Sequence, residues 1–477
     1  MEKMENTNLE SLTKSENTEI DLDKRKKRIK IIIIVVACVV AVTLIVVLSV
    51  VLTRKKYDDG EKTPETNFYG CMCDAGSSST RVSVYTWPQR KKNSIPVISE
   101  KGRESTNPGM HSMNDTQIEN AMNTLINYCK NKVNEVSKNN ANLTEVSFYL
   151  KATAGMRSIS EEEQNNKLDV VRRTIKNSTL KFLNDSWAKV ITGSEEGVFG
   201  WITGNYLNRI LFDNEEKGKV TTLPYGSIDL GGYSLEITFY TEEEIKEHRV
   251  NLSLSNINYN LYSYSFQDYG QDKFNEHLLH FLIENSTESE DSTVIQHPCY
   301  LNGFITTYIY KDINYTIQGN NNIDKCKESI TLLMNINKKE EGEKSMNDTY
   351  QPKIPDGTKF YGISGLYWIA YFFDLADDKF HAPSEFLPVT EQFCKKNWDD
   401  AVKEYSQKTD KSRLKNYCIT GFYVYYFLAQ GFKLEENKQI ISFPDKISNV
   451  EVSWTLGAMS YEVGLQPLKY ARFYIDE

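Results

Sequence analysis

Two distant segments of the chain share one pattern of residues. Residues 74–85 and 229–240 each begin with Asp, have Gly two positions later and Ser five positions later, continue with apolar residues at alternate positions, and end with Tyr. Alternating apolar residues are typical of a β-strand, and a Gly-rich turn between two strands predicts a hairpin. The repeat therefore predicts two related half-domains that face one cleft.

The turn residues of both hairpins suit phosphate binding. Gly lets the backbone approach a phosphate closely, Ser and Thr hydroxyls add donors, and a carboxylate at a strand end can hold a divalent cation. A single turn of this kind is more often only a hairpin turn. Its recurrence favours two phosphate-binding loops, and the strand and helix patterns that alternate around them predict the α/β class.

The charge of the chain excludes one class of partner. The sequence has 56 Lys and Arg against 65 Asp and Glu, a net charge of −9. Nucleic-acid binding through a broad basic face is therefore not expected. A phosphate bound by this protein has to be held locally, by backbone amides, hydroxyls or a metal ion.

The N-terminal region carries a separate signal. No charged residue occurs in residues 31–52, and a helix of that length spans roughly 33 Å, enough to cross a bilayer core. A cleaved signal peptide has a shorter apolar stretch, and a buried core helix is the remaining alternative. Basic residues are more numerous before the segment than after it, which predicts a cytosolic N-terminus. We predict a disordered tail at 1–30, an anchor at 31–52 and a stalk at 53–65.

Glycosylation signals fit this single-pass type II topology. All Asn-x-Ser/Thr acceptors follow the anchor, so the rest of the chain is expected to face the secretory-pathway lumen (Golgi or similar) or the exterior. The acceptors are Asn114, Asn142, Asn177, Asn184, Asn251, Asn285, Asn314 and Asn347.

The cysteines also suit an oxidising compartment. Neighbouring cysteines near the C-terminus predict the short-loop disulfides Cys299–Cys326 and Cys394–Cys418. Cys71, Cys73 and Cys129 form an odd remainder whose pairing stays open. Cys71 and Cys73 share one strand face, which disfavours a bond between them, and a zinc site at this pair lacks a matching second half.

Five segments, in their order and spacing, resemble the conserved regions of the nucleoside triphosphate diphosphohydrolases, the apyrase-type ectonucleotidases. The resemblance covers residues 68–460. The segments are DAGSSSTRVSVYTWP from Asp74, KATAGMR from Lys151, EEGVFGWITGNYL from Glu195, DLGGYS from Asp229 and YGISGLYW from Tyr361.

The resemblance implies a fold and its boundaries. The family has the actin, hexokinase and heat-shock-protein fold, in which two ribonuclease-H-like lobes enclose a nucleotide cleft. Lobe I is then expected at residues 66–192 plus 445–477, and lobe II at 193–444.

Carried across residue by residue, the resemblance implies a hydrolytic site. Glu196 would activate the attacking water and Ser234 would position it. Asp74 and Asp229, joined by Thr153, would hold Ca²⁺ or Mg²⁺ largely through water molecules. Without the resemblance, the Glu pair at 195–196 would be interpreted as a surface pair at the start of a helix.

The resemblance also implies binding residues, and it leaves alternatives open at two of them. Arg157 is either a cation near the cleft or a packing contact. Trp368 and Trp454 would stack on the nucleobase, with Tyr367 as the alternative to Trp368. Six residues would form the two phosphate cradles: Ser77, Ser78, Ser79, Thr80, Gly231 and Gly232.

Several features depart from the family pattern. Ser79 stands where many cell-surface members have His. Tyr233, Leu235 and Glu236 replace the usual residues of the fourth region, which leaves the preference between tri- and diphosphates open. A single anchor also differs from the two-anchor members. The helix around His277 resembles a metalloprotease helix in composition only, because its spacing lacks the HExxH order.

Together these features predict hydrolysis of the terminal phosphate of nucleoside tri- or diphosphates, with a divalent cation. Two alternatives remain: a kinase of the same fold, and a glycosylated nucleotide-binding receptor without turnover. The expected partners are the nucleotide and the membrane, and a homo-oligomer is left open.

Overall fold

The computed structural model describes residues 67–89, 94–286, 293–336, 343–465 and 474–476, which belong to one structural unit. The predicted tail, anchor and stalk lie outside the described residues. Within the described ranges, no helix combines the length and apolar character that crossing a membrane requires.

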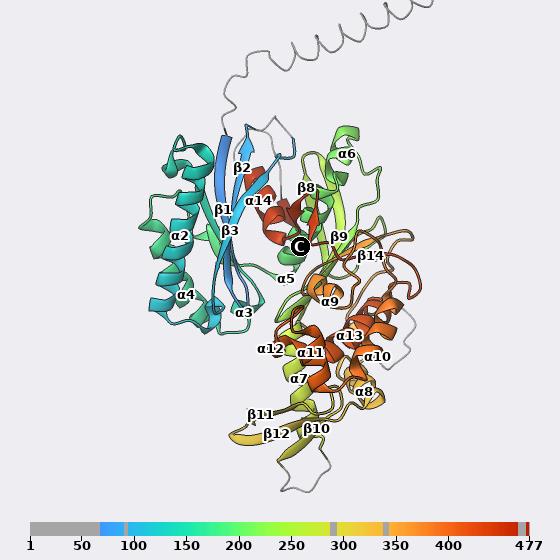
Figure 1. The fold of residues 1–477 in the computed structure, drawn as a ribbon. Helices are drawn as coiled ribbons and strands as arrows, with labels where there is room; N and C mark the ends of the chain where they lie inside the picture. The colour runs from blue at the N-terminus through green and yellow to red at the C-terminus, as the bar shows by residue number, and fades with distance from the viewer. Residues whose placement is uncertain (1–66, 90–93, 287–292, 337–342, 466–473, 477) are drawn as a thin grey trace, which may run out of the picture. The chain divides into compact units, whose positions relative to one another are not determined.

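The first sheet has five strands in the order β3-β2-β1-β4-β5. Its neighbours pair antiparallel between β3 and β2 and between β2 and β1, then parallel through β4 and β5. Helices α2 (Asp115–Ser137) and α4 (Glu161–Lys176) cover one face (Figure 1). The strands are β1 (Asn67–Ala75), β2 (Thr80–Pro88), β3 (Ser99–Thr106), β4 (Ser147–Ala152) and β5 (Ala188–Val190).

The second sheet repeats this arrangement. Its order is β14-β13-β6-β7-β9-β8-β17, and the run from β9 to β14 has the same sequence of antiparallel and parallel neighbours as the first sheet. The predicted α/β class and both predicted hairpins are therefore confirmed. The strands are β6 (Gly226–Leu230), β7 (Ser234–Tyr240), β8 (Arg249–Leu254), β9 (Ile257–Gln267), β13 (Phe360–Ser364), β14 (Ile441–Ser442) and β17 (Tyr474–Asp476).

Two helices connect the sheets in the core. Helix α5 (Gly193–Leu207) packs on β6, β7 and β9 and against α14 (Trp454–Leu465), which also contacts β1. Every residue from Glu196 to Leu207 is buried, so α5 lacks a polar face. The helices approach closely at Gly457, where a Cβ would lie 2.0 Å from the Phe199 carbonyl oxygen. A larger residue at 457 would push α14 away from α5.

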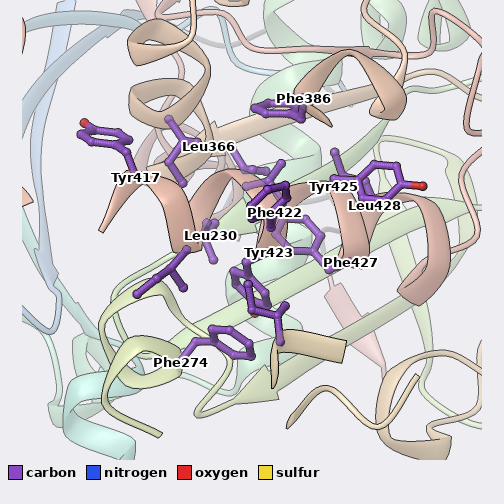
Figure 2. Packing of buried hydrophobic residues seen from close by; sticks show 14 of the residues in the cluster. Leu230, Phe274, Leu366, Phe386, Tyr417, Phe422, Tyr423, Tyr425, Phe427 and Leu428 are labelled. Atoms are coloured by element: carbon purple, nitrogen blue, oxygen red, sulfur yellow. The ribbon is translucent and has the colours of Figure 1, made fainter. Parts of the chain in front are cut away.

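A helical region packs against the second sheet. Figure 2 shows its aromatic core, in which Phe274 of α7 stacks on Tyr423 of α13 with ring centroids 3.9 Å apart. The small sheet β10-β12-β11 lies beside it. The elements are α3 (Ala154–Arg157), α6 (Ile210–Lys217), α7 (Gln271–Glu284), β10 (Val294–His297), β11 (Ile305–Tyr310), β12 (Ile313–Gly319), α8 (Ile323–Leu333), α9 (Gly365–Phe372), α10 (Phe386–Cys394), α11 (Trp398–Tyr405), α12 (Lys411–Leu414), α13 (Tyr417–Tyr426), β15 (Lys446–Ile447) and β16 (Val450–Glu451).

The disulfides resolve the pairing that the sequence left open. Cys299–Cys326 and Cys394–Cys418 form as predicted. Cys71 on β1 pairs with Cys129 on α2, while Cys73 is buried and free. The Cys71–Cys129 bond fastens α2 to β1, the strand that carries Asp74.

Candidate active site

The two predicted turns close with the same hydrogen bond. Gly76 N donates to Ser79 O and Gly231 N donates to Ser234 O, each at 3.0 Å. The turns also lie against each other, because a Cβ at Gly232 would be 2.4 Å from Ser77 Oγ. The structure thus brings together the two predicted phosphate cradles.

The aspartates that precede the turns have cross-strand partners of opposite charge. Asp74 pairs with Arg81, and their charged groups are 3.9 Å apart. Asp229 pairs with Glu236. Burial raises the pKa of Asp74, and Arg81 opposes that rise. Burial followed by the Glu236 charge raises the pKa of Asp229 to about 7.

Neighbouring glutamates at the start of α5 have different roles. Glu195 completes a capping box with Thr192, and Lys189 forms an ion pair with it at 2.5 Å. Glu196 is 7% exposed, and burial raises its pKa well above the ordinary value, with Glu236 as the next cause. The surface interpretation therefore fits Glu195 and is wrong for Glu196.

Arg157 holds the acidic cluster together. Its guanidinium lies 3.0 Å from Glu196 and 3.5 Å from Glu236, and it donates to Ser234 Oγ at 3.2 Å. Gln267 of β9 accepts a further bond at 3.3 Å. The Arg157 guanidinium thus contacts both Glu196 and Ser234, the residues assigned to the attacking water. These contacts favour the cleft role of Arg157 over a packing role.

Unpartnered oxygens mark where a cation would fit. Asp74 Oδ1, Asp229 Oδ2 and Glu236 Oε2 are buried without a hydrogen-bond partner in the described structure. Buried carboxylate oxygens are costly without a partner, and oxygen is the ligand that Ca²⁺ and Mg²⁺ prefer. Across the described ranges, no three His, Cys, Asp or Glu side chains converge closely enough to bind a metal by themselves. The donor set therefore fits a cation held partly through water.

Two strand ends, buried Thr153 and exposed Ser364, support the same edge. Thr153, 4% exposed, follows β4 and donates its N–H to the Ala75 carbonyl at 3.2 Å. Ser364 ends β13 at φ 59° and ψ −119°, a region that a residue other than Gly rarely occupies, and its side chain hydrogen-bonds Asp229. Sequence reasoning missed Ser364, although the strand-Ser-Gly-helix pattern of YGISG was a usable signal.

The tryptophans assigned to the nucleobase lie in different environments. Trp368 on α9 is 52% exposed, whereas Trp454 is 5% exposed and packs on Phe199 with ring centroids 6.4 Å apart. Tyr367 lines a cavity of about 430 Å³ together with Asp445. Both tryptophan assignments stay predictions.

The histidine pair on α7 has a structural environment. His280 Nε2 lies 2.7 Å from the Tyr308 hydroxyl on β11, and the segment is a regular helix. His297, the last residue of β10, is fully buried and stacks on Tyr300 with centroids 3.7 Å apart. Both lie outside the acidic cluster.

Comparisons with known proteins identify relatives of this chain. Ectonucleoside triphosphate diphosphohydrolase 1 of Bos taurus is 28% identical, over 92% of this chain and 89% of the relative. Probable apyrase 3 of Arabidopsis thaliana is 28% identical, over 83% and 82%. A solved structure of a nucleoside triphosphate hydrolase from Neospora caninum shares the fold, with a TM-score of 0.63, 14% identity and coverage of 87% and 95%.

These matches confirm the family resemblance predicted from the motifs. The pattern of one family extends over residues 61–471, which is most of the chain. The chain belongs to the GDA1/CD39 (nucleoside phosphatase) family.

Proposed function

We propose that the protein hydrolyses the terminal phosphate of nucleoside tri- or diphosphates with a divalent cation and a water activated by Glu196. The observation that carries the proposal is the meeting of two duplicated turns beside a buried Glu196, with Arg157 joining that carboxylate to Ser234. The phosphate chain binds between the turns, held by backbone amides and by Ser77, Ser78, Ser79, Thr80, Gly231 and Gly232.

The chain's own groups supply the base and its orientation. Glu196 accepts the proton of the attacking water, and burial keeps its pKa high enough for that task. Ser234 Oγ, at the start of β7, orients the same water. Arg157 stabilises charge that develops on the transferring phosphoryl group.

Asp74, Asp229 and Thr153 are the residues proposed to hold Ca²⁺ or Mg²⁺. When bound, the cation neutralises charge on the phosphates and makes the terminal phosphorus more open to attack. The unpartnered oxygens of Asp74 and Asp229 support this assignment.

The base-binding and membrane assignments complete the proposal. Trp368 and Trp454 are retained from the family resemblance, and the cavity beside Tyr367 makes that residue a third candidate for stacking. The catalytic region is proposed to be lumenal or extracellular behind the anchor at 31–52. Relatives named ectonucleoside triphosphate diphosphohydrolases support this location.

Phosphate release by the full chain tests the proposal. ATP, ADP, GDP and UDP should each be tried with Ca²⁺ or Mg²⁺ and with EDTA. Release that needs the cation and no acceptor is expected. A requirement for a sugar acceptor would indicate a kinase, and nucleotide binding without release would indicate a receptor.

A matched pair of variants tests the base. Glu196→Gln should lower kcat by at least about 10³-fold while nucleotide binding persists, because only the proton acceptor is lost. Glu195→Gln should keep nearly full activity, since Gln also completes a capping box. Normal turnover by Glu196→Gln would remove Glu196 from the base role.

A further inference from the structure

One face of the small sheet β10-β12-β11 is exposed and partly apolar. Strand β11 lies at the edge of this sheet and pairs antiparallel with β12. Every second residue of β11 is exposed, and two of these side chains are large and apolar: Ile305 is 63% exposed and Ile309 is 71% exposed. Exposed apolar side chains on an edge strand favour pairing with another chain, and natural proteins usually protect such an edge.

The opposite face of the same strands is already occupied. Tyr308 and Tyr310 of β11 form hydrogen bonds with His280 and Glu284 of α7. Ile317 of β12 is fully buried on this inner side. Because side chains alternate between the two faces of a strand, the two exposed isoleucines point away from α7. A small shift of β11 therefore cannot bury them in the core.

The register of the hairpin places a glycosylation acceptor on the exposed face. Lys311 and Asp312 form the two-residue turn between β11 and β12, at φ 49° and 63°, as the tight hairpin turn requires. The resulting register pairs Ile309 with Asn314, and directly paired residues point to the same face with Cβ atoms about 5 Å apart. Asn314 is exposed and begins an Asn-Tyr-Thr signal. The acceptor thus lies beside the more exposed isoleucine.

The rest of this outer face is polar. Thr316 pairs with Thr307, and Gln318 pairs with Ile305 at the far end of the hairpin. The strip from Asn314 to Ile305 extends roughly 13 Å along the strands. A branched oligosaccharide attached at Asn314 is long enough to follow this strip. Its sugar rings have apolar C–H faces and polar hydroxyl edges, which match a face that mixes isoleucine with threonine and glutamine.

We propose that an N-linked glycan on Asn314 covers this outer face by packing on Ile309 and Ile305, and that it keeps the β11 edge from pairing with another chain. A second copy of the chain is the competing occupant. The glycan is favoured because its acceptor points to the same face as the isoleucines, where a branched sugar would obstruct an approaching copy. This inference rests on the proposed lumenal or extracellular location, and it does not involve the acidic cluster.

Removal of the glycan from the folded protein tests the cover. The full chain is expressed in a eukaryotic secretory host, and glycopeptide mass spectrometry determines which acceptors carry sugar. Hydroxyl-radical footprinting then measures the modification rate of Ile309 before and after peptide N-glycosidase releases the glycans under native conditions. We expect sugar on Asn314 and a rise of at least about twofold in that rate, because the rate follows solvent exposure. An unchanged rate after complete release would overturn the cover.

Paired variants test the effect on self-association. Asn314→Gln should self-associate at about tenfold lower concentration than the parent in sedimentation velocity, the effect of uncovering one isoleucine. Adding Ile309→Thr should restore the behaviour of the parent, because the exposed apolar group is then lost. Asn177→Gln removes the acceptor at the end of α4, on the first sheet, and should behave as the parent does. Natively deglycosylated protein, with and without Ile309→Thr, gives the same comparison if Asn314→Gln is not secreted.

The remaining outcomes separate this inference from the proposed function. Sugar on other acceptors but not on Asn314 would overturn the cover and leave the proposed location intact, whereas sugar on none of them would overturn both. Equal self-association of Asn314→Gln and the parent would overturn the cover. A parent dimer that keeps Ile309 protected after release would assign the β11 edge to a second copy. Cation-dependent phosphate release by the same preparations tests hydrolysis separately, and its absence would overturn the proposed function alone.

Discussion

The two duplicated hairpins share a backbone and differ in charge. Each carries an Asp at the end of its first strand, and the residue seven positions later faces that Asp across the strand pair. In the first hairpin this residue is Arg81, and in the second it is Glu236. The comparison teaches that duplication supplied two equivalent turns, while one cross-strand position, occupied by Glu236 in the second hairpin, made that half more acidic.

A bound cation would offset more unbalanced negative charge at the second hairpin than at the first. Asp229, Glu236 and Glu196 all have pKa values raised by burial, and Arg157 contacts only two of them. Asp74 already has a cation opposite it. The two aspartates should therefore respond differently to mutation, although their local sequences match.

The largest expected effect separates the two aspartates. Asp229→Asn should lower kcat/KM by about 10³-fold and Asp74→Asn by about 10²-fold, measured at saturating Mg²⁺, because Asp229 faces the acid Glu236 across its strand pair whereas Asp74 faces Arg81. Titration of each variant with Mg²⁺ should show weaker activation for Asp229→Asn. Equal losses in both variants would break the comparison.

Cation binding should stabilise the fold most above pH 7, where Asp229 has lost its proton. The folded pKa of Asp229 is about 7 against an ordinary 3.8, so the folded state binds more protons than the unfolded state between these values. Stability without cation should therefore fall as pH rises from about 4 to about 7, and level off above that.

Melting curves with and without Ca²⁺ check this expectation. At a concentration of about 100 times Kd, the gain should be ~2.7 kcal/mol at pH 8 and smaller at pH 5, where protons compete for the same oxygens. Equal shifts in Tm at both pH values would contradict a cation bound at this cluster.

Glu236→Gln tests the charge that distinguishes the second hairpin. Removing it should relieve repulsion with Asp229, raise the Tm of the cation-free protein, and increase the Mg²⁺ concentration for half-maximal activity about tenfold. Glu236→Asp keeps the charge and serves as the control. An unchanged Mg²⁺ requirement would show that Glu236 plays no part in binding the ion.

Arg81→Gln should have the smallest effect. The Arg81 side chain is 49% exposed and 3.9 Å from Asp74, so solvent weakens the pair. A loss of less than about threefold in kcat/KM is expected at saturating Mg²⁺. A loss as large as that of Asp74→Asn would show that the exposed Arg81 is essential to the first cradle.

Local patterns in the sequence were sufficient for several features. The hairpins followed from period-two apolar residues around Gly-rich turns, and two disulfides followed from short spacings. Cys71–Cys129 could not be predicted, because its two cysteines lie on a strand and a helix whose contact depends on packing. Ser364 was missed although the YGISG pattern marks its place between a strand and a helix, because the hydrogen bond from its side chain to Asp229 depends on the packing of β13 beside β6.

The sequence by itself determined the class, the duplicated turns and the family, because each depends on residue types at fixed spacings along the chain. The tertiary structure decided that Glu196 is buried while Glu195 caps the helix, that Arg157 joins Glu196 to Ser234, and that His111 reaches Tyr233. These contacts join residues that are distant in sequence. The residues meet, and Glu196 becomes buried, only once the sheets and helices pack together.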